Sequence, residues 1–389
     1  MSLHDLSGSR LKVGNMCSLL PEADVFGFST YTVTYQNTVA LVKELRRQYP
    51  QAVFIAGGAH ASALPDDVAR DFDTVVCGEG EHVFVDLLQW IEQGQGKGDH
   101  KILCAAPIQD LDALPFPDFY KFGVTEGYTR RLNGQPVISL DSSRGCEYRC
   151  RFCNSRVSER GKWRMRSAQS VFAEVTWHCG NGWKSFRFND DNFLADRERT
   201  LQICEYLEPL RIEFRIFGRA QSLDAETCQS LVQAGCRHIG VGIESLSDPM
   251  LIRMGKGTRA SQIRAGVRAA REAGIRVRGF FICGFPGESE RTVDESLECL
   301  ADLGLDEAVV YPCIPYPGTD LFIHPQRYGI TWIDPDTSKY VQVGVDCSAG
   351  FVMRTETFGP DEVRGWHARY IKAFQSLGIA WSSETEFAI

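Results

Sequence analysis

Long hydrophobic runs are missing from this sequence of 389 residues. No stretch of about 18 apolar residues occurs, and the first residues lack the apolar core of a secretory signal, so we expect neither a membrane-spanning helix nor export. An excess of positive charge is missing too. The formal net charge is −8, which disfavours binding to a nucleic-acid backbone and is compatible with a cationic substrate. The remaining composition, 43% hydrophobic and 24% charged residues, is typical of a soluble globular protein.

The 14 cysteines do not accompany a secretory signal, so they do not predict a disulfide framework. They indicate a reducing compartment, and we expect a cytoplasmic protein. Three of them, Cys146, Cys150 and Cys153, stand within eight residues, and no second C-x2-C pair occurs elsewhere in the chain.

Three thiolates with the spacing C-x3-C-x2-C can hold three corners of a 4Fe–4S cluster, because such clusters are ligated by cysteine sulfur. No fourth cysteine follows at short spacing, so one iron is left open for an outside ligand. A zinc site would want four ligands, usually supplied as two pairs. We therefore predict a 4Fe–4S cluster on Cys146, Cys150 and Cys153, with zinc or no metal as the alternatives.

This spacing, with the aromatic Phe152 directly before the last cysteine, resembles the C-x3-C-x-aromatic-C motif of radical S-adenosylmethionine (SAM) enzymes. The resemblance implies that SAM binds the open iron and that one electron from the reduced cluster cleaves it to methionine and a 5′-deoxyadenosyl radical, which removes a hydrogen from a substrate. It also implies an external electron donor such as a flavodoxin or a ferredoxin. The competing class is a non-catalytic electron carrier or sensor, which has no need of an open iron.

Strands and helices alternate through residues 1–105, and glycines follow the strands. This alternation predicts a parallel, doubly wound sheet. The strands are expected at residues 23–29, 52–56 and 73–77, the helices at 37–49 and 83–92, and a polar loop at 93–103.

The turns Gly57-Gly58-Ala59-His60 and Gly78-Glu79-Gly80-Glu81 resemble those of the cobalamin-binding Rossmann-like domain that precedes the barrel in one branch of radical SAM enzymes. That domain normally opens with a further strand–helix–strand unit, but only 22 residues precede Ala23. The D-x-H-x-x-G motif that supplies a cobalt ligand in many cobalamin proteins is also absent. Because a ligand at the switch point of a sheet needs strands on both sides, we expect a truncated domain with a structural role, in which cobalamin is possible but not favoured.

A proline-containing linker at 106–135 leads into six strand–helix repeats at 136–319, which predict a partial (β/α)6 TIM-like barrel. Residues 320–389 form a small C-terminal extension with a helix at 359–377 that packs on the barrel. The six strands are expected at residues 137–142, 185–190, 212–218, 238–243, 276–283 and 307–313. Helices are expected at 197–207, 225–234, 259–273 and 291–303. Functional sites in such folds lie at the carboxyl ends of the strands.

Asp190 and Asp191 follow the second barrel strand. Carboxylates accept charge-assisted hydrogen bonds from an ammonium group, and the resemblance implies that one of them contacts the SAM amino group. An Asx turn that caps a helix is the alternative. Arg219, after the third strand, is predicted to pair with the SAM carboxylate, because a guanidinium binds carboxylates bidentately. A surface ion pair is the alternative for Arg219.

Glu244 and Ser245 end the fourth strand and match the family position that binds the ribose and the methionine moiety of SAM. The fifth strand ends in a turn that resembles the family's G-x-P-G-E turn beside adenine, where Gly284 lets the backbone come close. Glu288 in this turn has a structural alternative, since it could cap the next helix. The predicted cofactor-binding residues are thus Phe152, Asp190, Asp191, Arg219, Glu244, Ser245 and Gly284. No residue is assigned a catalytic role.

The truncated domain leads us to expect hydrogen abstraction without methyl transfer. A barrel mouth with Asp, Glu and Tyr suits hydroxyl and ammonium groups, so the expected substrate is a small polar natural-product intermediate, such as a sugar or an aminoglycoside. Dehydration, oxidation or epimerisation in antibiotic biosynthesis would make the enzyme a lyase or an oxidoreductase. The alternative is a cobalamin-dependent radical SAM C-methyltransferase.

Overall fold

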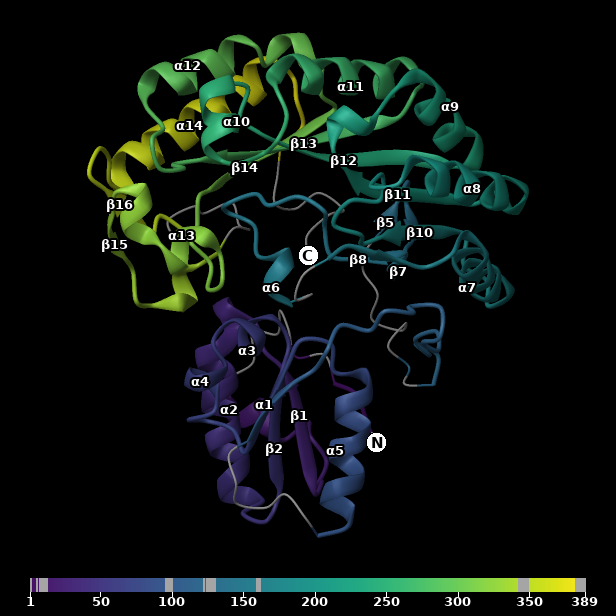
Figure 1. The fold of residues 1–389 in the computed structure, drawn as a ribbon, viewed down its shortest axis with the longest axis vertical. Coiled ribbons are helices and arrows are strands. Elements are labelled where there is room, and N and C mark those ends of the chain that lie inside the picture. Colours follow the sequence, from purple (N-terminus) through teal and green to yellow (C-terminus); the bar gives the residue numbers. More distant parts are fainter. Residues whose placement is uncertain are drawn as a thin grey trace.

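The computed structural model describes residues 2–4, 6, 13–94, 101–121, 123, 131–158, 162–341 and 350–381. They form two α/β parts, an N-terminal part and a larger barrel-like part, which lie one below the other in Figure 1. No helix in these ranges is long and apolar enough to cross a membrane.

The N-terminal part is built on four parallel strands in the order β1-β2-β3-β4. Alternate residues of the strands face opposite sides, so Phe54 and Ala56 pack toward α2 while Val53 and Ile55 pack toward α5. The strands are β1 (Val25–Ser29), β2 (Val53–Gly57), β3 (Thr74–Cys77) and β4 (Lys101–Cys104), and the helices are α1 (Val13–Cys17), α2 (Tyr35–Gln48), α3 (Ala59–Ala63), α4 (Pro65–Val68) and α5 (Glu81–Glu92).

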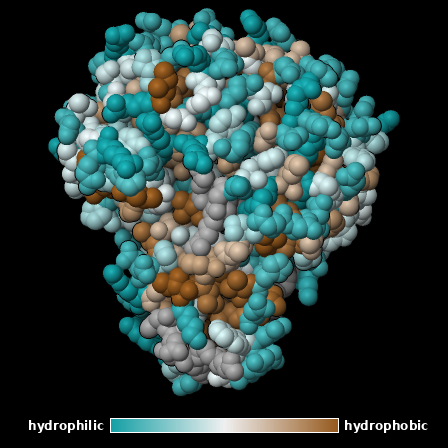
Figure 2. Space-filling view, in the orientation of Figure 1, coloured by the Kyte–Doolittle hydropathy of each residue, from teal (hydrophilic) through white to brown (hydrophobic). Residues whose placement is uncertain are grey.

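The three expected strands and two expected helices of this part are confirmed to within two residues. The end of the predicted loop at 93–103 is wrong, because Lys101–Cys104 pairs with β3 as a fourth strand. Its alternating pattern of exposure shows why the prediction missed it, since only Lys101 and Leu103 are half-buried. In Figure 2 apolar side chains gather on this part below the barrel, and its exposed apolar residues include Val85 and Trp90 on α5.

The larger part has six parallel strands in the order β14-β13-β12-β11-β10-β7, with helices on the outside of the arch that they form in Figure 1. All six predicted strands are confirmed. They are β7 (Ile138–Leu140), β10 (Ser185–Phe188), β11 (Glu213–Gly218), β12 (Cys236–Glu244), β13 (Arg276–Cys283) and β14 (Glu307–Pro312). The helices along them are α7 (Ala168–Gly180), α8 (Arg197–Leu207), α9 (Ala225–Ala234), α10 (Asp248–Arg253), α11 (Ala260–Glu272) and α12 (Glu290–Glu298).

The C-terminal helix α14 (Pro360–Ser376) packs on β13 and β14, as expected. Its side chains Trp366, Tyr370 and Phe374 are buried in the same core cluster as the barrel strands. The smaller elements are β5 (Arg131–Leu132), β6 (Gln135–Pro136), β8 (Ser143–Arg144), α6 (Ser155–Ser158), β9 (Arg164–Met165), α13 (Asp320–Ile323), β15 (Ile330–Ile333) and β16 (Met353–Thr355). Of these, β8 and β9 form an antiparallel ribbon that flanks the three-cysteine segment.

Substitution of Gly266 in α11 tests the close packing of this helix on the turn after β11. A Cβ at this position would lie 1.8 Å from the carbonyl oxygen of Ala220, in the short turn that follows β11. Gly266→Ala should therefore destabilise the protein by about 2 kcal/mol or more, because backbone has to move. In Gly365→Ala, the matched control in α14, the new methyl group meets nothing within 4 Å, and better helix propensity should add about 0.5–1 kcal/mol. Urea unfolding measures both, and equal stability of the two variants would contradict the packing described.

Candidate cluster and cofactor site

The three cysteines lie in the loop between β8 and α6. Cys146 and Cys150 are partly buried, whereas Cys153 is exposed. The Cys153 N–H donates to the Cys150 carbonyl (3.2 Å), and the Cys153 sulfur lies 2.8 Å from the Ser155 hydroxyl. Within the described ranges no three His, Cys, Asp or Glu side chains are arranged to hold a single metal ion. The ligands of a 4Fe–4S cluster bind three different irons, so they need not converge on one point.

The donor set fits an iron–sulfur cluster, since one loop carries three thiols and the Cys150 sulfur lies 3.6 Å from Arg219, which follows β11. Burial raises the pKa of the Cys146 thiol to about 12. Because the thiolate is the form that binds iron, cluster assembly has to release this proton.

The segment from the end of α10 to α11 is hydrogen-bonded to the cysteine loop. The Arg151 N–H donates to the Met254 carbonyl (3.0 Å), and its guanidinium donates to the carbonyl of Arg253 (2.9 Å). Phe152 packs into an apolar cluster, with its ring edge-on to Phe285 at 6.4 Å. The predicted cofactor residue Phe152 therefore ties the cysteine loop to the turn after β13.

Arg219 lies beside the cysteine loop. It is buried, its guanidinium stands 3.6 Å above the ring of Tyr148, and one of its nitrogens is 3.6 Å from the Cys150 sulfur. It also donates to the Lys256 carbonyl. A surface ion pair is therefore the wrong alternative for Arg219. A contact with the SAM carboxylate stays a prediction.

Glu244 ends β12 in a left-handed backbone conformation (φ 63°), at a break in the register with β13. Its carboxylate accepts a hydrogen bond from Lys256 (2.8 Å), and both side chains are buried. A Cβ on Gly242 would lie 2.5 Å from the carboxylate and 2.7 Å from the lysine nitrogen, so only glycine leaves room for the pair. The sequence analysis did not single out Lys256. The available signal was its place between Gly255 and Gly257, both at positive φ.

Ser245 is not among the residues that the structure brings to this edge. Its hydroxyl is fully buried, lies 3.0 Å from that of Ser296 in α12 and accepts a hydrogen bond from the Ser247 N–H. Its hydroxyl is thus engaged within the barrel and not with Lys256, the partner of Glu244, and its predicted contact with SAM stays a prediction.

Gly284 adopts a positive φ (78°), and the space that a side chain would need is taken by Val363 of α14. Its N–H donates to the buried carboxylate of Glu288, whose pKa burial raises to about 8. The structural alternative for Glu288 is thus supported, although Ser289 and not Glu288 caps the helix α12. The approach of Gly284 to adenine stays a prediction.

Asp190 and Asp191 point to different surroundings. The Asp190 carboxylate is buried and accepts hydrogen bonds from the Ser142 N–H (3.1 Å) and hydroxyl (2.7 Å) and from the Ser143 hydroxyl. It holds the start of the cysteine loop and has little capacity left for a ligand. Asp191 lines a cavity instead, where desolvation and the charge of Asp190 raise its pKa, while a hydrogen bond from Ser155 lowers it.

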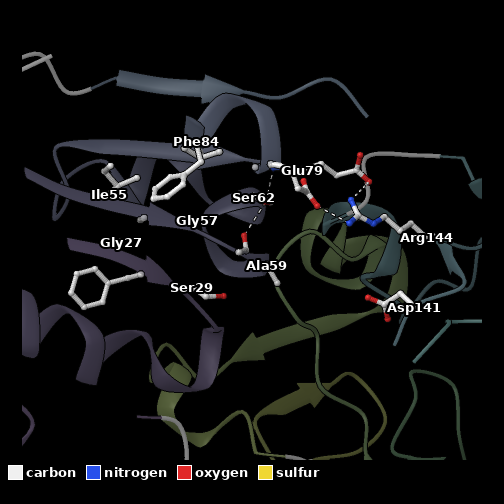
Figure 3. Close-up of a pocket in the computed structure, with 18 of the residues that line it drawn as sticks. Gly27, Ser29, Ile55, Gly57, Ala59, Ser62, Glu79, Phe84, Asp141 and Arg144 are labelled. Carbon is white, nitrogen blue, oxygen red and sulfur yellow. Dashed lines mark hydrogen bonds and ion pairs between the residues drawn. The ribbon is translucent and has the colours of Figure 1, made fainter. Parts of the chain in front are cut away.

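This cavity has a volume of about 630 Å³ and lies between the two parts of the molecule (Figure 3). The carboxyl ends of β1, β2 and β3 form one wall, and the ends of β7 and β10 form the other. The lining from the barrel consists of Asp141, Ser143, Arg144, Gly145, Asn189 and Asp191. Asp141 opens to the cavity but is enclosed by protein on its other sides, and this desolvation raises its pKa to about 6. Sequence analysis missed Asp141 and Arg144, because neither belongs to a motif.

The N-terminal wall suits a ligand with amide groups. Five glycines line it, at positions 27, 57, 58, 78 and 80, so peptide groups face the cavity without side chains over them. The Ser62 hydroxyl fixes this edge, since it donates to the Gly58 carbonyl and accepts from the Gly78 N–H, both at 2.9 Å. These peptide groups are hydrogen-bonding partners that fit the amide side chains of a corrin ring.

Removal of one thiol tests the cluster assignment. Anaerobic reconstitution should give about four irons per chain, and Cys150→Ala should bind no stable cluster because only two thiolates remain. Cys104→Ala is the matched control, since Cys104 is exposed on β4, in the N-terminal part. Stoichiometric zinc in the reconstituted protein, or unchanged iron content in Cys150→Ala, would contradict the assignment.

Glu244→Gln separates SAM binding from cluster binding. Loss of the charge should weaken SAM binding by about tenfold or more, with the iron content unchanged. Asp190→Asn should lower both, because it loosens Ser142 and Ser143. Equilibrium binding of SAM to reconstituted protein and iron analysis give both quantities. Unaltered SAM affinity in Glu244→Gln would remove Glu244 from the SAM site.

Comparison with known protein families agrees with this geometry. The pattern of the radical SAM superfamily matches residues 140–300, and that of the B12 binding domain matches residues 20–88. Neither the second match nor the four-stranded sheet shows the domain to be truncated, so that expectation is without support.

Two curated relatives cover most of the chain. Uncharacterized methyltransferase PH0819 of Pyrococcus horikoshii is 28% identical over 319 residues, which is 77% of this chain and 69% of the relative. The bacteriochlorophyllide d C-8(2)-methyltransferase of Chlorobaculum tepidum is 23% identical over 330 residues, which is 82% of this chain and 71% of the relative.

Among solved structures, the radical SAM methyltransferase TsrM from Kitasatospora setae, with cobalamin and a [4Fe-4S] cluster bound, has a similar fold. The TM-score is 0.66 at 16% identity, over 94% of this chain and 80% of TsrM. The cysteine loop at the strand ends, the glycine-lined sheet edge and these matches lead to one conclusion: the chain belongs to the radical SAM superfamily, in the branch that carries an N-terminal B12-binding domain.

Proposed function

We propose that this radical SAM enzyme is a cobalamin-dependent methyltransferase that acts on a small molecule. Cobalamin would bind in the cavity between the two parts, and SAM would bind at the cysteine loop. The observation that carries the proposal is the composition of the cavity wall. The residues just before the first cysteine, Ser143, Arg144 and Gly145, line the same cavity as the glycine edge of the B12-binding domain.

The relatives support methyl transfer over the expected hydrogen abstraction alone. Both curated relatives named above are methyltransferases by name, and TsrM is a methyltransferase with cobalamin and a [4Fe-4S] cluster bound. The expectation of a lyase or oxidoreductase rested on a domain too short to bind cobalamin. The cavity removes that premise, because its second wall comes from the barrel. A sugar or aminoglycoside substrate and a role in antibiotic biosynthesis have no support from the relatives named here.

The cofactors supply the chemistry that the side chains cannot: a bound cluster supplies the electron that cleaves SAM, and a bound cobalamin supplies a carrier for the methyl group. The chain binds and orients. Of the two predicted carboxylates, Asp191, which lines the cavity, is the partner of the SAM amino group, because Asp190 is engaged by Ser142 and Ser143. Lys256 positions the carboxylate of Glu244, which would accept hydrogen bonds from the ribose hydroxyls of SAM. Arg219 places a positive charge beside Cys150. An external donor such as a flavodoxin or a ferredoxin would deliver the electron.

A side chain placed in the cavity tests the proposal. Reconstituted protein should bind one cobalamin per chain when aquacobalamin is added, and it should form 5′-deoxyadenosine or a methylated product from SAM under reducing conditions. In Gly57→Leu the new side chain points into open space at the cavity edge, with only the Val76 carbonyl within 4 Å of its Cβ. This variant should lose cobalamin binding and keep its iron.

Gly180→Leu is the control, because a Cβ there meets nothing within 4 Å and the residue lies at the end of α7, away from the cavity. Absence of cobalamin binding together with transfer of deuterium from a labelled substrate into 5′-deoxyadenosine would overturn the proposal in favour of hydrogen abstraction alone. Absence of any SAM cleavage by the reduced cluster would favour the electron carrier.

A further inference from the structure

Glu79 of the B12-binding domain is buried in a set of contacts with the other part of the molecule. Its two carboxylate oxygens accept hydrogen bonds from the two terminal nitrogens of Arg164, at 2.6 and 2.8 Å. Arg144 lies 3.5 Å from the same carboxylate, and the N–H of Ile108 in the linker donates to it at 2.5 Å. These charges and the hydrogen bonds hold the pKa of Glu79 below its usual value against the effect of burial.

The two arginines occupy a particular place in the fold. Arg144 and Arg164 are directly opposite each other in the antiparallel ribbon of β8 and β9. The chain between them contains all three cysteines of the cluster loop. One carboxylate of the B12-binding domain therefore contacts both ends of the loop that carries the cluster ligands. Glu81, from the same turn, binds Arg144 a second time at 2.6 Å.

We propose that Glu79 is a positioning residue that couples the B12-binding domain to the cluster loop, so that occupation of the cavity is transmitted to the cysteines. Glu79 and Arg144 both line the cavity, and Figure 3 shows their ion pair at its edge. A ligand in the cavity therefore touches the pair that fixes the loop. A bidentate, buried pair of this kind holds geometry strictly, because an unpaired charge left behind in the interior is costly.

The functional role of this coupling rests on the proposed function. A methyl group can pass between two bound cofactors and a substrate only if their sites keep a fixed separation. The B12-binding domain and the barrel each have their own hydrophobic core. Packing within either core therefore does not set the distance between the two cofactor sites. The Glu79 contacts with Arg144 and Arg164 join the two parts at the edge of the cavity, next to the cluster loop.

Hydrogen exchange measured by mass spectrometry on the reconstituted full chain tests the coupling, with aquacobalamin as the probe. In the wild type, cobalamin should slow exchange both in residues 74–84 of the B12-binding domain and in residues 143–158 of the cluster loop. In Glu79→Gln, residues 74–84 should still respond, while the protection transmitted to 143–158 should fall roughly tenfold or more. Arg144→Lys, which leaves the Arg164 pair intact, should show a smaller loss.

Glu213→Gln is the control, since Glu213 forms a partly exposed ion pair with Arg237 within the barrel and should transmit protection like the wild type. Transmission to residues 143–158 in Glu79→Gln equal to that in the wild type would overturn the proposal.

If cobalamin does not bind the wild type at all, the proposed function fails, and the coupling is then tested on the protein without cobalamin. Glu79→Gln alone should then speed exchange in residues 143–144 and 164–165, and unchanged exchange there would overturn it. If Glu79→Gln does not fold, Arg144→Lys carries the same test.

Discussion

The loop with the three predicted cluster ligands keeps Cys153 exposed and Cys146 and Cys150 only partly buried, so deep burial of the thiols does not hold it in place. The structure holds it by polar contacts at its base and along its back. Asp190 binds the Ser142 and Ser143 segment before the first cysteine, and the Met254 carbonyl binds the Arg151 N–H between the second and the third. Arg144 and Arg164 are fixed at the two ends. Each contact comes from a different element, so the position of the loop depends on the whole arrangement of strand ends.

Buried charges carry much of this arrangement. The pairs of Glu79 with Arg164 and of Glu244 with Lys256 are both buried at distances below 3 Å. Moving two charges out of water costs as much as their attraction returns, so such pairs add little net stability. They do exclude other geometries, because a shifted loop would leave a charge without its partner. In a site where two domains meet, defined geometry is worth more than stability.

The strands of the barrel could be predicted from the sequence because the signal is local. The apolar run of β12 ends in Glu244 and that of β13 is followed by Gly284, and each predicted strand exists. The direction of a side chain at the strand end is not local. Ser245 follows Glu244 yet turns into α12, and Asp190 turns back to the cysteine loop while Asp191 faces the cavity. Motif position could not distinguish these neighbours.

Site residues that lie outside the strand ends were still harder to predict from the sequence. Lys256 comes from a loop between two helices and reaches Glu244 only because Gly242 leaves the space. In the sequence, Gly255 and Gly257 mark an unusual turn around Lys256, but nothing there indicates that Lys256 meets Glu244.

The cavity wall likewise could not be predicted from the N-terminal sheet alone. Within one open sheet a ligand needs strands on both sides, and the order β1-β2-β3-β4 has no reversal to provide them. The second wall of the cavity comes instead from β7 and β10 of the other part, with their ends facing those of β1 to β3. Whether a B12-binding sheet of this kind can hold a cofactor is therefore decided by how the two parts are placed. That placement depends on contacts such as those of Glu79, so a residue that contacts none of the three cysteines helps to set the shape of the cavity.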